Sequence, residues 1–408
     1  MTLNPLEQHV CETLATRHQA MVEDLREAVE ISTKSGHNEG LDRYRALMRA
    51  RLESLQAATH LIPGDPRPAW IDPDDAGIQA PPPPTLFADR LCGDRTRPRI
   101  LLAGHLDTVH PPDSPFRHFT IDEARAQATG PGVVDMKGGL VIALHALSAL
   151  AEAEAPVAWS FILNSDEETG SYHSDAALRA AAVDHDFGLA LEPAMADGGL
   201  VIQRPGSGQF MIEATGRAAH VGRDFNAGIS AVNALASCIL EVAKLPDAAR
   251  GIIASIGPLK GGVAANVVPD LARAWGNVRV PTADLAREVR TTLLALSSAD
   301  SAQKALRANQ PHVRVFESFN RPPKPPTPAS LALAEQARQA AASLGQPLPF
   351  GRTGGVCDGN NLQDAGLATI DTLGVRGGGL HTPTEWIDLS SLVQRSQLLA
   401  VLMLRLSN

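Results

Sequence analysis

The sequence predicts an α/β protein in which a large domain with a central, mostly parallel sheet carries a smaller domain inserted into it. Strand-like and helix-like apolar patterns alternate from about residue 97, which is typical of an α/β layer. Residues 208 to about 318 instead follow the order β-α-β-β-α-β, the split βαβ arrangement of ferredoxin-like domains. The length, 408 residues, also exceeds the size at which a single core usually stops growing.

The N-terminal region is expected to be helical. Apolar side chains recur at helical spacing between residues 4 and 58, and the polar stretch STKSGHNEG at 32–40 divides this region into two helices. The proline-rich stretch PPPPT at 81–85 lies between candidate strands. We interpret it as a stiff surface loop rather than a domain linker.

The alternating part of the large domain contains five elements before the insertion. They are, in order, the strand RILLAG, the helix GGLVIALHALSALAEA, the strand VAWSFIL, the helix SDAALRAAA and the strand FGLALE. Alternation of this kind predicts parallel strands joined by helices.

The inserted domain is predicted from a second run of elements. They are strand 209–215, helix 229–243, strands 252–259 and 270–280, helix 282–296 and strand 312–317. After the proline-rich stretch NRPPKPPTPAS, the α/β pattern resumes with helix 329–344 and the strand LATIDTLGV. The predicted division is therefore 1–207, 208–318 and 319–408, with the first and last segments forming one discontinuous domain.

Composition narrows the possible partners. The chain is 44% hydrophobic and 20% charged, and its 36 basic and 45 acidic residues give a formal charge of −9. This balance argues against a nucleic-acid partner and favours cations. The N-terminus lacks a basic and apolar signal segment, and no stretch is expected to reach the length of a membrane span. We therefore expect a cytoplasmic protein without a membrane partner. The four cysteines lack CxxC spacing, so they predict neither a disulfide framework nor a thiolate zinc site.

Acidic and imidazole side chains follow the apolar strands of the α/β part. They are His105 and Asp107 in GHLDTVHP, Asp135 in GPGVVDMKGG, Glu167 and Glu168 in SDEETGS, Glu192 in LEP and His381 in HTPTEW. Each alone is commonly a structural histidine or a capping carboxylate. Together they should meet at the carboxyl edge of the sheet, where ligands bind in open α/β folds. Nitrogen and oxygen ligands fit zinc, cobalt or manganese better than a soft metal.

These motifs, in this order and together with GRAAHVGRDFNAGISA and NVVPD, resemble those of the dinuclear zinc peptidases and deacylases. That family includes glutamate carboxypeptidase, acetylornithine deacetylase, succinyl-diaminopimelate desuccinylase and aminoacylase. The resemblance spans roughly residue 30 to the C-terminus. It is greatest to the glutamate carboxypeptidase branch, because ISTKSGHNEGL resembles its N-terminal signature and the fourth motif ends in Glu192 rather than Asp.

The resemblance implies a role for each of these side chains. Asp135 would bridge two divalent metals, zinc ions for which cobalt or manganese can substitute, with His105 and Glu192 on one metal and Glu168 and His381 on the other. Glu167 would be the general base that takes a proton from water. Asp107 would accept the second ring N–H of His105 and fix its tautomer. Asp166, which no motif position claims, is expected to be solvated or to cap a turn. A cis peptide is implied at Asp135–Met136.

Substrate-binding residues are also implied by the resemblance. His220 would stabilise the oxyanion, commonly from the partner subunit, although Val221 stands where Ala or Ser is usual. Asn266 would support the substrate carbonyl or carboxylate; alternatively, it is a turn residue. Arg321 would grip a substrate α-carboxylate, and Arg279 is a rival for that role or for an interface. The backbone N–H groups of Gly354 and Gly355 could bind the same carboxylate, with Asp358 orienting their loop.

The helix AVNALASCILEVAKL in the inserted domain is apolar on more than one face. One face should cover its own sheet, and the other predicts a homodimer. The alternative is a monomer whose second face tolerates water.

The functional prediction is a metal-dependent hydrolase that cleaves the amide bond of a small peptide or N-acyl amino acid with activated water, in the manner of a carboxypeptidase. The alternatives are an N-acyl amino acid deacylase similar to acetylornithine deacetylase and a non-catalytic family member that binds an amino acid. Absence of a G-x-S-x-G motif argues against a serine nucleophile.

Overall fold

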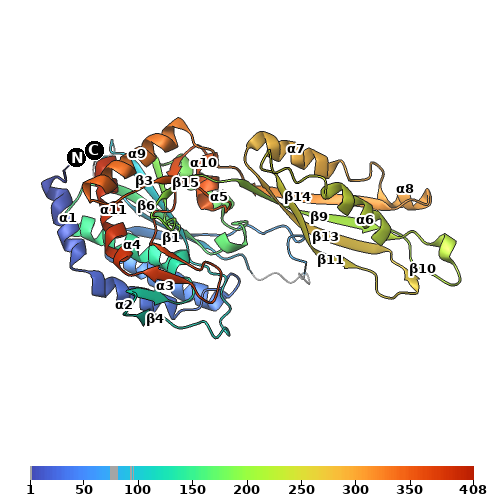
Figure 1. Ribbon diagram of the computed structural model, residues 1–408, viewed down its shortest axis with the longest axis horizontal. Coiled ribbons are helices and arrows are strands. Elements are labelled where there is room, and N and C mark those ends of the chain that lie inside the picture. The colour runs from blue at the N-terminus through green and yellow to red at the C-terminus, as the bar shows by residue number, and fades with distance from the viewer. Residues whose placement is uncertain (1, 74–80, 92–93, 95) are drawn as a thin grey trace. The chain divides into compact units, whose positions relative to one another are not determined.

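The computed structural model describes residues 2–73, 81–91, 94 and 96–408, and it divides into two compact units. The larger unit comprises Met1–Pro66, Ala80–Arg204 and Pro326–Asn408, and the smaller unit comprises Arg67–Gln79 and Pro205–Pro325 (Figure 1). The insertion is therefore slightly longer than the predicted span 208–318, and it takes in a short segment that we had assigned to the large domain.

The larger unit is built on a six-stranded mixed sheet in the order β1-β2-β6-β3-β7-β16. The strands are β1 (Ala58–Ile62), β2 (Thr85–Arg90), β3 (Arg99–His105), β6 (Ala158–Asn164), β7 (Phe187–Ala190) and β16 (Ala368–Ile370). Strands β6, β3, β7 and β16 run parallel to their neighbours in that series, whereas β1 and β2 are antiparallel additions at one edge. The predicted mostly parallel sheet is confirmed.

Alternation along the strands places a separate apolar cluster on each face of this sheet. In β3, Ile100 and Leu102 belong to the main core, whereas Leu101 and Ala103 belong to a second cluster, as a side-chain period of two requires. The main core takes in residues of α1 (Pro5–Ala15), α2 (His18–Val29), α3 (Asn38–Ser54), α4 (Gly138–Glu152), α9 (Pro328–Ser343) and α11 (Ser390–Leu406). The second cluster takes in α5 (Asp175–Val183) and α10 (Asp358–Asp364).

The N-terminal region contains three helices where the sequence predicted two. The first predicted helix ends at Ala15 and a second begins at His18. The Thr16 hydroxyl donates to the Thr13 carbonyl oxygen at 2.8 Å, a local side-chain contact that competes with continuation of the helix. Buried Leu14 and Met21 lie on either side of this break and both belong to the core.

The segment Val133–Glu152 is long and apolar enough to cross a membrane, contrary to the prediction that no stretch reaches that length. The mean hydropathy of its 18-residue apolar window is 1.5, and 89% of that window is buried inside the protein. The helix α4 within it packs against α11, α1 and α2. Its apolar composition is therefore accounted for by its place in the core.

Smaller elements complete the larger unit. A four-stranded antiparallel sheet has the order β17 (Gly377–Gly378), β18 (Trp386–Asp388), β5 (Gln127–Thr129) and β4 (Thr120–Asp122), and β15 (Phe350–Arg352) pairs with β8 (Leu200–Gln203) in parallel. A π-helical turn, η1 (Val133–Lys137), precedes α4, and a 3₁₀ turn, η2 (Glu167–Thr169), follows β6.

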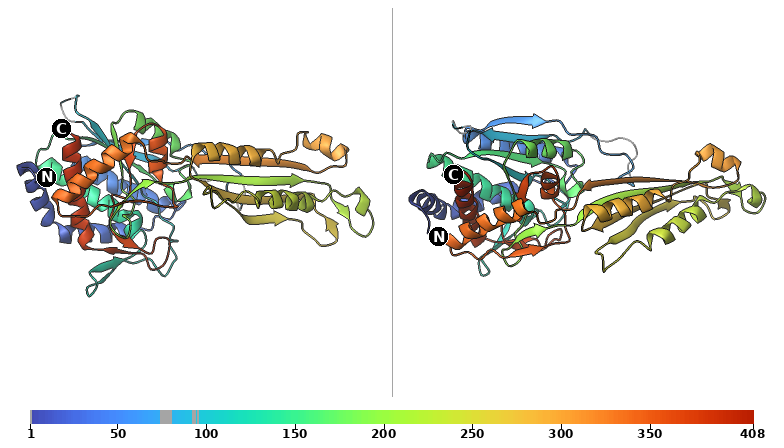
Figure 2. Two further views of the ribbon diagram at one scale, coloured as in Figure 1. Left: turned by 45° about the horizontal axis from the view of Figure 1, so that its top comes forward. Right: turned by 90° about the horizontal axis from the view of Figure 1, so that it is seen from above.

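The smaller unit has the predicted order of strands and helices. Its sheet, β11-β13-β9-β14, is antiparallel throughout and comprises β9 (Gly206–Thr215), β11 (Ile253–Gly261), β13 (Leu271–Val280) and β14 (His312–Arg321). Two helices, α6 (Ala231–Val242) and α7 (Ala283–Leu294), cover one face and enclose a single apolar core (Figure 2). The additional elements are β10 (Ala219–His220) paired with β12 (Val267–Val268), η3 (Phe225–Ala227) and α8 (Ala302–Arg307).

The segment that begins at Arg67 packs on the smaller unit rather than on the large domain. The Trp275 indole N–H donates to the Trp70 carbonyl oxygen at 2.6 Å, and Lys260 Nζ donates to the Pro73 carbonyl oxygen at 2.6 Å. The Trp70 ring also lies 6.3 Å from that of Phe316. These tertiary contacts cover a sheet face that the local sequence pattern could not assign to this segment.

Candidate metal centre

Several of the predicted ligands lie at one edge of the central sheet. His105 is the last residue of β3 and is in register with Asn164, the last residue of β6. Glu167 and Glu168 begin the 3₁₀ turn after β6, and Glu192 lies two residues beyond the end of β7. Because β3, β6 and β7 are parallel, their carboxyl ends meet at the same edge.

Two further predicted ligands reach this edge from other elements. Asp135 lies in η1, directly before α4, and the Asp135–Met136 peptide is cis, as the resemblance implied. His381 lies in the turn between β17 and β18 and has a positive φ of 61°.

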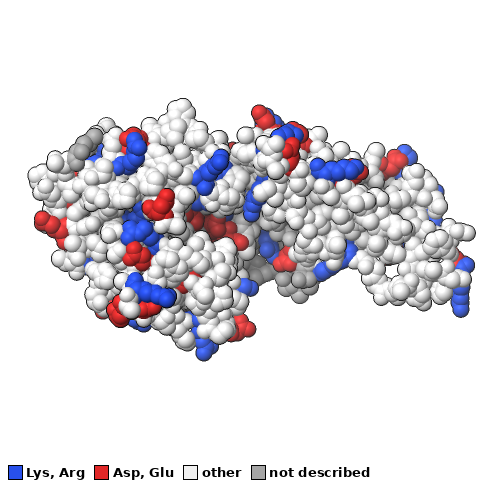
Figure 3. All heavy atoms as spheres, in the orientation of Figure 1, with Lys and Arg blue, Asp and Glu red and all other residues white. Residues whose placement is uncertain are grey.

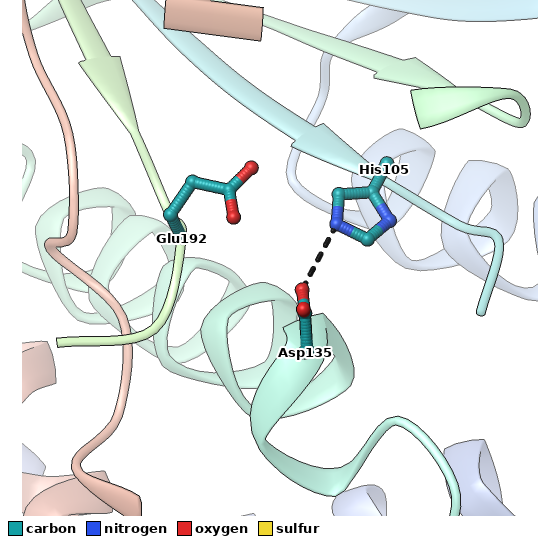
Figure 4. A group of neighbouring side chains, drawn as sticks. All are labelled: His105, Asp135 and Glu192. Carbon is teal, nitrogen blue, oxygen red and sulfur yellow. Dashed lines mark hydrogen bonds and ion pairs between the residues drawn. The ribbon is translucent and has the colours of Figure 1, made fainter. Parts of the chain in front are cut away.

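The two oxygens of the Asp135 carboxylate contact different imidazoles. Oδ1 lies 3.2 Å from His105 Nε2, and Oδ2 lies 3.4 Å from His381 Nε2. His381 Nε2 is also 3.2 Å from Glu168 Oε2. Glu192 extends its carboxylate toward the His105 ring from the end of its strand (Figure 4). Two groups of three ligands, each with its ligand atoms within 4.8 Å of one another, therefore share Asp135: His105, Asp135 and Glu192, and Asp135, Glu168 and His381.

The carboxylates favour the charged form of both imidazoles. Burial by itself lowers the pKa of His105, but the contacts with Asp107 and Asp135 outweigh it and hold that pKa well above its usual value. Hydrogen bonds with Asp135 and Glu168 raise the pKa of His381 to about 10. Each imidazole thus lies in a strongly negative environment.

The pKa values of the three carboxyl groups shift in different directions. It raises the pKa of Glu192 to about 8 and also raises the pKa of Glu168. Burial acts in the same direction on Asp135, but hydrogen bonds from His105 and His381 lower its pKa below the ordinary value. Three carboxyl groups within one small volume repel one another unless positive charge compensates them.

The ligand set fits divalent cations. All of its ligand atoms are imidazole nitrogens or carboxylate oxygens, as zinc, cobalt and manganese accept. Over the part of the chain that the structure describes, the buried Glu168 Oε1 has no hydrogen-bond partner, and a buried carboxylate oxygen without a partner is costly. The residues present therefore suit two cations that share Asp135.

The tautomer of His105 is fixed by Asp107, but mainly through its main chain. His105 Nδ1 lies 2.9 Å from the carbonyl oxygen of Asp107 and 3.4 Å from its carboxylate Oδ1. The predicted side-chain contact is therefore the longer of the two. Donation from Nδ1 leaves the Nε2 lone pair free for a cation.

The Asp107 carboxylate organises the neighbouring acidic turn instead. It is fully buried and accepts from Glu167 N through Oδ1 and from Glu168 N through Oδ2, both at 3.1 Å. The Ser35 hydroxyl donates to Oδ2 at 2.7 Å. The sequence pointed to STKSG only as a family signature, and the structure shows which atoms in it approach the site.

Asp166 is not solvated, contrary to one of the two roles we considered for it. It is 2% exposed, and its Oδ2 accepts from His173 N at 2.6 Å. Its carboxylate makes no capping hydrogen bond to η2 either, and the contacts with Thr169 N and Ser171 N are made by its main-chain oxygen.

Two charged residues near the site were missed in the sequence analysis although both lie in the quoted motifs. Lys137 in GPGVVDMKGG is buried, and its Nζ donates to the Ala28 and Ile31 carbonyl oxygens at 3.0 and 2.7 Å. Burial lowers its pKa to about 7. Glu385 in HTPTEW is buried beneath the turn that carries Asp135. Motif order identified the loops, but not these anchoring contacts.

The glycine loop predicted to bind a carboxylate lies in the larger unit. Gly354 and Gly355 follow β15, and the Gly355 carbonyl oxygen accepts from Arg204 Nη1 at 3.3 Å. Asp358 begins α10 and is buried; its two carboxylate oxygens accept from the Ser171 hydroxyl and Asn164 Nδ2, each at 2.7 Å. It ties α10 to the segments around β6.

The four predicted residues of the smaller unit form two separate pairs. Arg279 in β13 and Arg321 in β14 are both in register with Ser207 of β9, the strand that lies between them. His220 and Asn266 lie beyond the opposite ends of these strands, where Val221 N donates to the Asn266 carbonyl oxygen at 2.9 Å. The intervening strand length is about 27 Å at the usual rise per residue. The smaller unit does not bring the two pairs together.

The face drawn in Figure 3 carries interspersed acidic and basic side chains rather than a continuous basic stripe among its coloured residues.

Comparison with known proteins identifies similar sequences and folds. The model of peptidase family M20/M25/M40 matches residues 101–405. Carboxypeptidase G2 of Pseudomonas sp. strain RS-16 is 25% identical over 402 residues, covering 95% of this chain and 89% of the relative. A tripeptidase structure from Staphylococcus aureus has a TM-score of 0.73 at 20% identity and covers 96% of this chain and 98% of its own. The structure of a Bacillus subtilis protein described as a dinuclear metal binding peptidase from the M20 family has a TM-score of 0.64 at 16% identity, with 96% and 98% coverage.

Proposed function

Because the chain belongs to peptidase family M20/M25/M40, we propose that this metallopeptidase-family hydrolase uses two divalent cations, zinc ions in the native protein, to cleave an amide bond next to a free carboxylate. The proposal rests on the position of the Asp135 carboxylate, whose two oxygens contact different histidines. A carboxylate so placed can serve two cation sites at once.

We propose that each ligand group holds one cation. His105 and Glu192 would complete one site, Glu168 and His381 the other, and Asp135 would be common to both. When bound, the two cations supply an activated water and polarise the amide carbonyl.

Glu167 is proposed as the general base. Its backbone N–H donates to Asp107, which fixes the turn from which the side chain extends. Glu168, the next residue, contacts His381, whereas Glu167 belongs to neither ligand group. The two adjacent carboxylates therefore have different roles. Glu168 holds a cation, and Glu167 takes the proton of the attacking water and returns it to the leaving amine.

A carboxypeptidase-like substrate is supported by two sets of donors. Arg279 and Arg321 are both in register with Ser207 on the strand between them, and guanidinium groups suit bidentate recognition of a carboxylate. The loop with Gly354 and Gly355 offers backbone N–H groups for the same purpose. Either set of donors would by itself suit the C-terminal carboxylate of a small peptide or that of an N-acyl amino acid, and deacylation therefore remains the alternative activity.

We propose that the protein acts as a homodimer formed through the smaller unit. Strand β11 is an edge of its sheet, and its Ile253 and Leu259 are 61% and 58% exposed. Leu240 on α6 is 66% exposed. A second copy would cover these apolar groups and provide a partner for the strand edge. The distance between His220 and the arginine pair is consistent with a role for His220 in the partner's site.

The test measures metal content and hydrolysis on one preparation. The substrates are N-acyl amino acids and dipeptides with C-terminal Glu, Asp or aliphatic residues, assayed before and after chelation and after return of Zn²⁺ or Co²⁺. About two metals per chain and metal-dependent release of an amino acid are expected. Release of small acyl groups alone would favour the deacylase alternative, and activity that survives complete metal removal would contradict the proposal.

The dimer is tested by light scattering of the wild type and of Leu240→Asp. We expect a dimeric mass for the wild type and a shift toward the monomer for the variant. A monomeric wild type at micromolar concentration would contradict the proposed interface.

A further inference from the structure

We propose that Glu385 is a positioning residue for the reaction, because its buried carboxylate holds the turn of Asp135 and joins it to the loop of His381. The inference deepens the proposed function, since it rests on Asp135 and His381 being cation ligands. Glu385 itself belongs to neither ligand group.

Glu385 accepts hydrogen bonds from three backbone N–H groups of a single turn. Its Oε1 lies 2.8 Å from Val134 N and 3.0 Å from Asp135 N, and its Oε2 lies 3.0 Å from Gly132 N. The residue is 1% exposed. Hydrogen bonds to a buried carboxylate are stronger than those between neutral groups, so these contacts restrain the turn strongly.

This turn would otherwise lack acceptors for its main chain. Asp135 and Met136 have non-helical dihedral angles inside η1, and Gly132 has a positive φ of 71°. The regular i→i−4 pattern therefore cannot satisfy these N–H groups, and buried N–H groups require partners. Because one of the bonds is to the N–H of Asp135, Glu385 fixes the main chain from which the bridging carboxylate extends.

The loop that carries Glu385 also contacts the side chain of Asp135. His381 lies four residues before Glu385, and its Nε2 is 3.4 Å from Asp135 Oδ2. The loop is closed by Glu385 N donating to the Thr382 carbonyl oxygen at 3.2 Å. Glu385 thus anchors the base of the loop while His381 contacts the carboxylate of Asp135.

A fourth donor connects Glu385 to the segment after β3. His110 Nε2 lies 2.7 Å from Glu385 Oε2, and the His110 ring packs 5.2 Å from that of Phe116. His110 is five residues beyond His105, the ligand at the end of β3. One buried carboxylate therefore links three chain segments that each carry a ligand: those of His105, Asp135 and His381.

The test compares Glu385→Gln with Glu7→Gln by Co²⁺ titration of the metal-free full-length protein. Glu7 is a matched control because it is 2% exposed and accepts from one backbone N–H and from the cationic side chain of Arg405. We expect Glu385→Gln to weaken at least one Co²⁺ equivalent about 10- to 100-fold and to change the visible spectrum of the bound Co²⁺. Glu7→Gln should leave both unchanged.

Kinetics with a hydrolysed substrate provide a second measurement. Glu385→Gln should lower kcat with little change in KM, since Glu385 positions ligands rather than substrate. Co²⁺ affinity and spectrum equal to those of the wild type would overturn the inference, whatever the activity. If Glu385→Gln does not fold, Glu385→Asp retains the charge but shortens the side chain. Weakened Co²⁺ binding by folded Glu385→Asp would support the inference, and binding equal to the wild type would overturn it.

The outcome separates this inference from the proposed function. Co²⁺ titration requires no substrate, so a wild-type protein that binds metal but hydrolyses nothing would contradict the function and still test Glu385. Conversely, an active enzyme whose Co²⁺ affinity and spectrum are unchanged by Glu385→Gln would contradict only the positioning role.

Discussion

The substitution Asp107→Asn should weaken metal binding although Asp107 is not itself a ligand. Its carboxylate accepts from Glu167 N, Glu168 N and the Ser35 hydroxyl, and its Oδ1 lies 3.4 Å from His105 Nδ1. Asparagine replaces one of the two oxygens with an NH₂ group. Since Oδ1 and Oδ2 each accept from a different backbone N–H, one of those donors must face another donor in either orientation of the amide.

The expected cost is that of the amide orientation that loses fewer hydrogen bonds. If the NH₂ group replaces Oδ1, the bonds from Ser35 and Glu168 N remain and one buried N–H is left without an acceptor, at a cost of about 1–3 kcal/mol. In the metal-free protein the lost charge also relieves repulsion of Asp166 and Glu168, which reduces this cost. In the metal-bound protein the lost charge and the displaced turn both disfavour the cations, so affinity should fall about 10- to 100-fold.

The assay is competition of Zn²⁺ or Co²⁺ between a chromophoric chelator and the protein, with urea unfolding of the metal-free form alongside. Ser35→Ala is the matched control. It removes one donor to Oδ2 but leaves Glu168 N as its partner, so we expect a loss of about 0.5–1.5 kcal/mol in unfolding free energy and a much smaller change in affinity. Metal affinity of Asp107→Asn within twofold of the wild type would refute the reasoning, as would an equal loss in Ser35→Ala.

Three further predictions concern the base and two buried ion pairs. Glu167→Gln should retain both metals but lose about 10²- to 10⁴-fold in kcat. Metal analysis and steady-state kinetics measure the two effects, and unchanged hydrolysis would contradict the assignment of Glu167 as the base. Asp371→Asn should lower the unfolding free energy in urea by about 3–5 kcal/mol, since it leaves the Arg204 guanidinium buried without its carboxylate partner; a loss below about 1 kcal/mol would argue against that ion pair. Burial alone would raise the pKa of Glu7, but Arg405 and a backbone N–H lower it below 4.5. The stability that Glu7→Gln removes should therefore be fully present above pH 4.5 and vanish as pH falls through the lowered pKa; a pH-independent difference between the urea unfolding curves of wild type and variant would contradict this.

The sequence predicted which residues approach the sheet edge because two simple constraints coincide there. Strand endings are visible as apolar runs that stop at His105 or shortly before Glu167 and Glu192, and parallel strands must place those endings at one edge. The order β-α-β-β-α-β in the smaller unit was readable for the same reason, since alternating strands and amphipathic helices have distinct periods.

What the sequence did not predict depends on contacts between distant segments. Trp70 lies on the smaller unit because its carbonyl oxygen accepts from Trp275, some 200 residues away. Likewise, Lys137 and Glu385 stood in conspicuous motifs, but their hydrogen-bond partners lie 106 and 250 residues distant. Local periodicity carries no information on such pairings.

The two ligand groups differ in how firmly the protein holds them. His105 is 1% exposed, and its ring is fixed through Nδ1 by the Asp107 carbonyl oxygen, whereas the His381 side chain is 53% exposed in a turn. Asp135 is the only ligand that the two groups share. A displacement of its turn therefore disturbs both groups, whereas a displacement of His381 disturbs one. The hydrogen bonds from Gly132, Val134 and Asp135 to the buried Glu385 therefore restrain the one turn on which both ligand groups depend.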